Sequence, residues 1–150
     1  MASNVEFHTG LPDPIGYACR LLRKAQRQGL RVLVTAPSAT LAKLDRELWT
    51  FEEREFVPHQ RWPAGSAGPQ PDAVRIGRTP IWLAVSAQVP TACTVLVNLG
   101  ADVPAESVDF ERVVELVSHE ADDAAAGRER WRRWKALGLE PSHRNAAPAS

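Results

Sequence analysis

The sequence predicts a single α/β domain of three layers, in which a mostly parallel sheet is flanked by helices. Short apolar runs rich in β-branched residues alternate along the chain with segments whose apolar residues recur at helical spacing. Of the 150 residues, 44% are hydrophobic and 24% are charged, which is typical of one folded domain that needs no disulfide or metal for stability. We expect residues 1–140 to form this domain. Residues 141–150 are small and polar, so we expect them to form a flexible tail.

The first half of the chain is predicted to contain two strands and two helices. Residues 5–8 are β-prone, and residues 15–25 carry apolar residues in one helical stripe. Gly29 stands where a glycine commonly follows the end of a helix. Residues 30–36 are apolar and β-branched, which predicts a buried strand. A second helix is expected to begin with Ser38 as its N-cap.

The second half begins with a predicted surface loop over residues 61–79, where Pro and Gly are frequent. Residues 81–85 and 94–99 are short apolar runs that predict central strands. Residues 110–117 fit both a helix and a strand, so periodicity does not decide between them. From residue 120 onward, an alanine-rich and then cationic segment predicts a terminal helix.

The charge balance excludes a protein that binds nucleic acid over its whole surface. Eighteen Lys and Arg residues stand against 18 Asp and Glu residues, for a net charge of zero, whereas such proteins are usually basic. The charges are nevertheless segregated. Residues 20–31 carry five cations and no anion, residues 101–123 carry eight acids and one cation, and residues 128–135 carry five cations and one acid. A partner would respond to these local fields.

Cysteine content and hydropathy indicate where the protein resides. Cys19 and Cys93 lack a metal-binding or redox spacing, so we expect both to be buried thiols. The sequence has no apolar run of membrane-spanning length, and its first eight residues form neither the basic nor the apolar region of a secretory leader. We therefore expect a cytoplasmic protein that does not bind a membrane.

The motifs of common catalytic and cofactor sites are missing from the sequence. No GxGxxG or GxxxxGK[ST] pattern is present to cradle a phosphate, and no serine stands in a GxSxG elbow. The four histidines, His8, His59, His119 and His143, lack metal-ligand spacing. We expect no catalytic residue, no metal and no cofactor. A small α/β nucleotide-binding enzyme remains an alternative.

The terminal helix carries the strongest candidate site. At about 100° per residue, Arg128, Trp131, Arg132 and Lys135 fall on one stripe, while Trp134 lies near the opposite side and is expected to face the core. An indole beside guanidinium groups suits a ligand that has both an apolar side chain and a carboxylate. Two alternatives stay open: a solvated basic face, and stacking on the bases of single-stranded nucleic acid.

Three blocks of the sequence resemble a known family, the chi subunit of bacterial DNA polymerase III, an accessory protein of the clamp loader. The first is LDRELW at residues 44–49 followed by FVPH at residues 56–59, and the second is the order of an opening strand, a basic helix, residues 29–33 and a loop rich in Pro and Gly. The third is Leu116, Val117 and Glu120, followed by RERWR at residues 128–132 and by Gly138. The resemblance covers about residues 5–139 and depends on the order and spacing of the blocks. It implies a Rossmann-like α/β fold that binds no nucleotide and catalyses nothing. It also implies that residues 110–117 form a strand.

The resemblance further implies a partner, the acidic C-terminal tail of single-stranded DNA-binding protein, which ends in Pro-Phe. Carried over by position, Val117 and Trp131 would line the pocket for the terminal Phe ring. Arg128 would hold the terminal carboxylate, and Arg132 and Lys135 would attract the acidic residues of the tail.

A second partner implied by the resemblance is the psi subunit. Trp49 and Phe56 stand at the aromatic positions of the surface that docks psi in the family. The chain also departs from the family pattern. Trp131 replaces the usual Tyr, and Ala124 stands where some members carry a Lys, which removes one cationic contact. The implied function is a non-catalytic adaptor that links the clamp loader to coated single-stranded DNA, without sequence-specific DNA binding of its own.

Overall fold

The computed structural model describes residues 4–50, 57–63, 71–87, 93–101 and 110–145. The strands are β1 (Asn4–Leu11), β2 (Val32–Thr35), β3 (His59–Arg61), β4 (Ile81–Ala84), β5 (Val95–Asn98), β6 (Arg112–Ser118) and β7 (Ser142–Asn145). The helices are α1 (Pro14–Arg27), α2 (Ser38–Thr50), α3 (Ala73–Arg78) and α4 (Ala121–Ala136).

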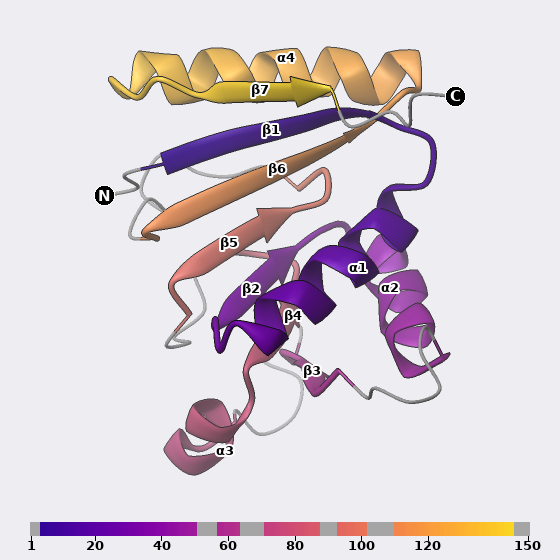
Figure 1. The fold of residues 1–150 in the computed structure, drawn as a ribbon, viewed down its shortest axis with the longest axis vertical. Coiled ribbons are helices and arrows are strands. Elements are labelled where there is room, and N and C mark those ends of the chain that lie inside the picture. Colours follow the sequence, from indigo (N-terminus) through magenta and orange to yellow (C-terminus); the bar gives the residue numbers. More distant parts are fainter. Residues whose placement is uncertain (1–3, 51–56, 64–70, 88–92, 102–109, 146–150) are drawn as a thin grey trace.

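The strands form one parallel sheet in the order β3-β4-β2-β5-β6-β1-β7 (Figure 1). Successive side chains of a strand point to opposite faces, so the sheet has two apolar half-cores. Val32 and Val34 of β2 pack in the half-core that contains the buried residues of α1 and α2, whereas Leu33 packs in the half-core that contains Trp134 of α4. The predicted three-layer α/β domain is confirmed.

The helix ends follow the local sequence signals. Asp13 caps α1 by accepting a hydrogen bond from the backbone N–H of Gly16 at 3.1 Å, and Pro14 opens the helix. Gly29 follows α1 with a φ of 71°, the left-handed conformation that glycine adopts most easily. The prediction of Ser38 as the N-cap of α2 is wrong by one residue: Ser38 is itself the first helical residue, and the carbonyl of Pro37 accepts the hydrogen bond of the Leu41 backbone N–H at 3.0 Å.

Residues 112–118 form a strand, β6, which resolves the ambiguity in the sequence. All five residues from 113 to 117 are buried, because helices cover this part of the sheet on both faces. A strand buried on both faces shows no alternation of polar and apolar residues. Its run of apolar residues therefore fits a buried helix as well as a strand.

Three short elements lie where the sequence predicts none. β3 ends at Arg61, the first residue of the predicted loop of residues 61–79, and α3 lies inside that loop, so the loop prediction is wrong for residues 73–78. Arg31 holds the end of α3 by donating hydrogen bonds to three backbone carbonyls of residues 76, 77 and 79, at 2.7–3.1 Å. β7 occupies part of the segment predicted as a flexible tail; that prediction is wrong for residues 142–145, which pair with β1. Residues 146–150 lie outside the described part of the chain.

The two cysteines differ in their surroundings. Cys19, on the inner side of α1, is fully buried, as predicted. The same prediction is wrong for Cys93, which is half-buried. Burial, followed by the nearby charges of Glu47 and Asp13, raises the pKa of the Cys19 thiol to about 11. Since the thiolate is the reactive form, this thiol is inert near neutral pH.

We expect Cys19 in a Cys93→Ser variant to resist Ellman's reagent at pH 8 in the native protein. At that pH about one thiol in a thousand is ionised when the pKa is about 11. Unfolding in guanidinium chloride should release one full equivalent, which is the control for reagent and concentration. Labelling of the native variant at the rate of a free cysteine would contradict this assignment.

Candidate functional site

A pocket of about 720 Å³ lies between α4 and the sheet edge formed by β6, β1 and β7. Its lining joins residues far apart in the sequence, and it includes Val117, Arg128, Trp131 and Arg132 from the predicted site. The full lining is Phe7, Thr9, Gly10, Val117, Ser118, His119, Ala124, Gly127, Arg128, Trp131, Arg132 and His143. We call this the α4 pocket.

The apolar wall of the α4 pocket depends on close packing of α4 against β6. A Cβ atom on Gly127 would lie 3.0 Å from both methyl groups of Val117, so glycine is what lets the helix approach so closely. Trp131 is half-buried and packs edge-on against Phe7, with ring centroids 5.1 Å apart. Its other neighbour is His143 of β7, at 6.4 Å.

The cations of α4 are distributed unequally around this wall. Arg128 and Arg132 are exposed and line the pocket, and Arg132 forms an ion pair with Glu129. Lys135 is exposed but does not line the pocket. Arg130 is buried, so the cationic patch is smaller than residues 128–135 indicate in the sequence.

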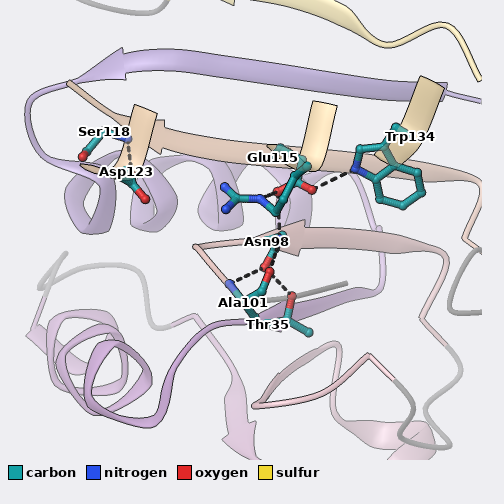
Figure 2. Close-up of polar contacts among 8 residues, drawn as sticks. Thr35, Asn98, Ala101, Glu115, Ser118, Asp123 and Trp134 are labelled. Carbon is teal, nitrogen blue, oxygen red and sulfur yellow. Dashed lines mark hydrogen bonds and ion pairs between the residues drawn. The ribbon is translucent and has the colours of Figure 1, made fainter. Parts of the chain in front are cut away.

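Beneath α4, a buried network fixes the helix on the sheet (Figure 2). The Glu115 carboxylate accepts hydrogen bonds from Arg130 Nε at 2.9 Å, from Trp134 Nε1 at 2.9 Å and from Asn98 Nδ2 at 2.8 Å. Asn98 in turn accepts a bond from Thr35 Oγ1 at 2.9 Å. The chain of contacts crosses β2, β5, β6 and α4.

Opposing effects act on the ionisation of Glu115. Complete burial raises the pKa of its carboxyl group above the ordinary value. The charge of Arg130 and the three donated hydrogen bonds lower the pKa and offset only part of this rise. Because Arg130 and Trp134 face Glu115, the stripe that carries Arg128 and Trp131 faces the pocket. The network thus sets the orientation of the candidate site.

Carboxylates occupy the starts of α1 and α4, where an α/β fold would place a phosphate. Asp123 accepts a hydrogen bond from the backbone N–H of Ser118 at 2.6 Å (Figure 2), and Asp13 caps α1. Negative side chains at these positions disfavour an anionic nucleotide. Among the described residues, no cluster of His, Cys, Asp and Glu could hold a metal ion.

The second predicted surface is described in part. Trp49, near the end of α2, is 61% exposed and packs edge-on against His59 with ring centroids 5.3 Å apart. Phe56 lies outside the described residues. No described helix has the length and hydropathy needed to cross a membrane.

Sequence reasoning missed Phe7, Gly127 and His143 as pocket residues, and Arg130 and Glu115 as their support. A signal existed for Glu115, because it is the one charged residue in the apolar run of residues 113–117. No local signal could join β1 to α4 and β7, since these contacts span most of the chain.

Known proteins resemble the chain over most of its length. A protein-family model described as DNA polymerase III chi subunit, HolC, matches residues 2–142. The chain is 34% identical over 122 residues to DNA polymerase III subunit chi of Pseudomonas aeruginosa, with 81% of this chain and 78% of that protein covered. It is 28% identical over 129 residues to the subunit chi of Haemophilus influenzae, with 85% and 84% covered.

Solved structures show the same fold in distant proteins. The C-terminal domain of S. cerevisiae Dbp5, in a complex with Gle1, matches with a TM-score of 0.60 and 13% identity, covering 97% of this chain and 90% of that one. At such low identity the likeness concerns the fold alone. By the family match and the two bacterial relatives, the chain belongs to the DNA polymerase III chi subunits, accessory subunits of the replicative holoenzyme.

Proposed function

We propose that the chain is a non-catalytic adaptor that links the clamp loader to single-stranded DNA-binding protein by binding that protein's acidic C-terminal tail. The observation that carries the proposal is the composition of the α4 pocket. An apolar wall of Phe7, Val117 and Trp131 stands directly beside the guanidinium groups of Arg128 and Arg132. A peptide that ends in an aromatic residue, with its free carboxylate and preceding acids, complements both parts.

Each part of such a tail has a counterpart in the pocket. The terminal Phe ring packs between Trp131 and Val117, where aromatic contact and apolar burial favour it. Arg128 holds the terminal carboxylate with a charge-assisted, bidentate hydrogen bond. Arg132 and Lys135 attract the preceding Asp residues through solvent-exposed charges, so affinity falls as salt concentration rises.

The adaptor needs a second surface for the clamp loader, and we assign this to the region of Trp49. An exposed indole on a helix is a common anchor of protein interfaces, and Trp49 is 61% exposed. The psi subunit is the partner that the family resemblance implies for this surface.

We expect Arg128→Ala to weaken binding of a peptide ending in Pro-Phe by about 1–2 kcal/mol, because a charged partner of the terminal carboxylate is lost. Fluorescence titration of the labelled peptide measures this. Arg20→Ala removes an exposed arginine from α1, outside the pocket, and serves as the matched control that leaves affinity unchanged.

The same titration tests the pocket with a peptide that lacks the terminal Phe. Equal affinity for the two peptides would contradict the proposal. Binding of oligothymidine with the affinity of the tail would support direct recognition of single-stranded nucleic acid instead. Thermal stabilisation by nucleotides would support the nucleotide-binding alternative.

A further inference from the structure

A second pocket, of about 590 Å³, lies at the other edge of the sheet, between the end of α2, β3 and α3. We call this the β3 pocket. Its lining includes Trp49 and three arginines, Arg61, Arg75 and Arg78. These three arginines lie outside the α4 pocket and belong to none of the motifs considered in the sequence.

The described lining of the β3 pocket carries three arginines and one carboxylate. Asp45 is the one acid among the described lining residues. Its carboxylate lies 2.8 Å from Nε2 of His59, whose Nδ1 bonds to the backbone carbonyl of residue 57 at 2.7 Å. Asp45 is thus engaged by His59. Within the described part of the chain, Arg61 and Arg78 have no hydrogen-bond or ion-pair partner, and both are exposed.

A hydrogen-bond chain orients the third guanidinium group. Arg75 Nε donates to Gln60 Oε1 at 2.5 Å, and Gln60 Nε2 donates to Thr79 Oγ1 at 3.1 Å. Since Nε is the donor in this contact, the terminal nitrogens of Arg75 remain for an anion. The side chain is therefore positioned before any ligand arrives, which lowers the entropic cost of binding.

Exposed apolar side chains adjoin these charges. Trp49 and Val74 are each 61% exposed, and Val74 precedes Arg75 on α3. Large apolar side chains that are this exposed and lie next to cations fit a protein segment that has both a bulky side chain and carboxylates. Single-stranded nucleic acid fits less well, because it binds along several exposed rings, and Trp49 is the one strongly exposed aromatic residue among those described.

We infer that the β3 pocket binds an acidic segment of the clamp-loader subunit that docks at Trp49, with Arg61, Arg75 and Arg78 selecting for its carboxylates. This inference rests on the proposed function of the Trp49 surface and adds the charge and location of the segment that is recognised. Because the β3 and α4 pockets lie at opposite edges of one sheet, the two partners do not compete for the same surface.

The test compares two charge-reversal variants of equal size. Arg61→Glu with Arg78→Glu changes the β3 pocket, and Arg20→Glu with Lys24→Glu changes exposed residues of α1 outside both pockets. Each full-length variant is immobilised, and surface plasmon resonance measures binding of the clamp loader assembled from subunits of the source bacterium. Circular dichroism confirms that both variants are folded.

We expect the β3-pocket variant to bind the clamp loader at least about tenfold more weakly than wild type and to lose most of the salt dependence. The α1 variant should bind as wild type does. Both variants should keep wild-type affinity for the tail peptide, so a failure here is distinct from a failure of the α4 pocket. Equal binding by all three proteins, equal weakening in both variants, or competition by oligothymidine would each overturn the inference.

Discussion

Replacing Glu115 by alanine is expected to lower the free energy of unfolding by about 3–5 kcal/mol. The change removes a completely buried carboxylate and leaves Arg130, Trp134 and Asn98 with donors that no longer have their acceptor. An uncompensated buried guanidinium group is the largest part of this cost, because it cannot reach water without moving α4. Urea unfolding followed by far-ultraviolet circular dichroism measures the loss.

Two further variants show whether the loss comes from the buried network. Glu140→Ala removes an exposed carboxylate just beyond α4 and should change stability by less than about 0.5 kcal/mol. Glu115→Leu combined with Arg130→Met removes both charges and should recover part of the stability that the single change loses. A loss below about 1 kcal/mol for Glu115→Ala would show that α4 does not depend on this contact.

The same network explains why the outer stripe of the terminal helix could be predicted but its inner face could not. Helical geometry alone separates Arg128 and Trp131 from Trp134, and burial of Trp134 agrees with the sequence prediction. Arg130, however, shares the buried side with Trp134. An arginine in a cationic run indicates a solvated face, and its burial depends on Glu115, a partner 15 residues earlier on another element.

The fold could be predicted in its central part for a related reason. β2, β4 and β5 are short, fully buried and mostly apolar, so their sequences alone identify them. β3 and β7 lie at the edges of the sheet and are polar. Such strands form because a neighbour offers backbone hydrogen bonds, and this depends on tertiary contacts that no local pattern contains.

This dependence on tertiary contacts also limits what could be predicted of the site. The sequence identifies the stripe on α4, but the opposite wall of the pocket comes from Phe7 on β1 and His143 on β7. Thr9 Oγ1 and His143 Nε2 lie 2.6 Å apart, so the edge strand is anchored beside the pocket by a contact between the two ends of the chain. A segment predicted as a flexible tail thereby becomes part of the candidate site.

Trp131→Ala is expected to weaken binding of the Pro-Phe tail peptide by about 2 kcal/mol or more, roughly 30-fold. Its indole lines the α4 pocket and packs edge-on against Phe7, with ring centroids 5.1 Å apart. Trp131→Tyr keeps an aromatic ring there and should stay close to wild type. Trp49→Ala, outside this pocket, is the matched tryptophan control and should leave tail affinity unchanged.

A double-mutant cycle isolates the contact between Trp131 and the terminal Phe of the peptide. Wild type and Trp131→Ala are each titrated with the complete peptide and with the peptide lacking Phe, after thermal unfolding confirms that the variant is folded at the assay temperature. If the two rings pack together, removing Phe costs much less affinity in the variant than in wild type, and the difference is the coupling energy. A coupling energy near zero would place the terminal ring elsewhere and leave Arg128 as the main determinant of tail binding.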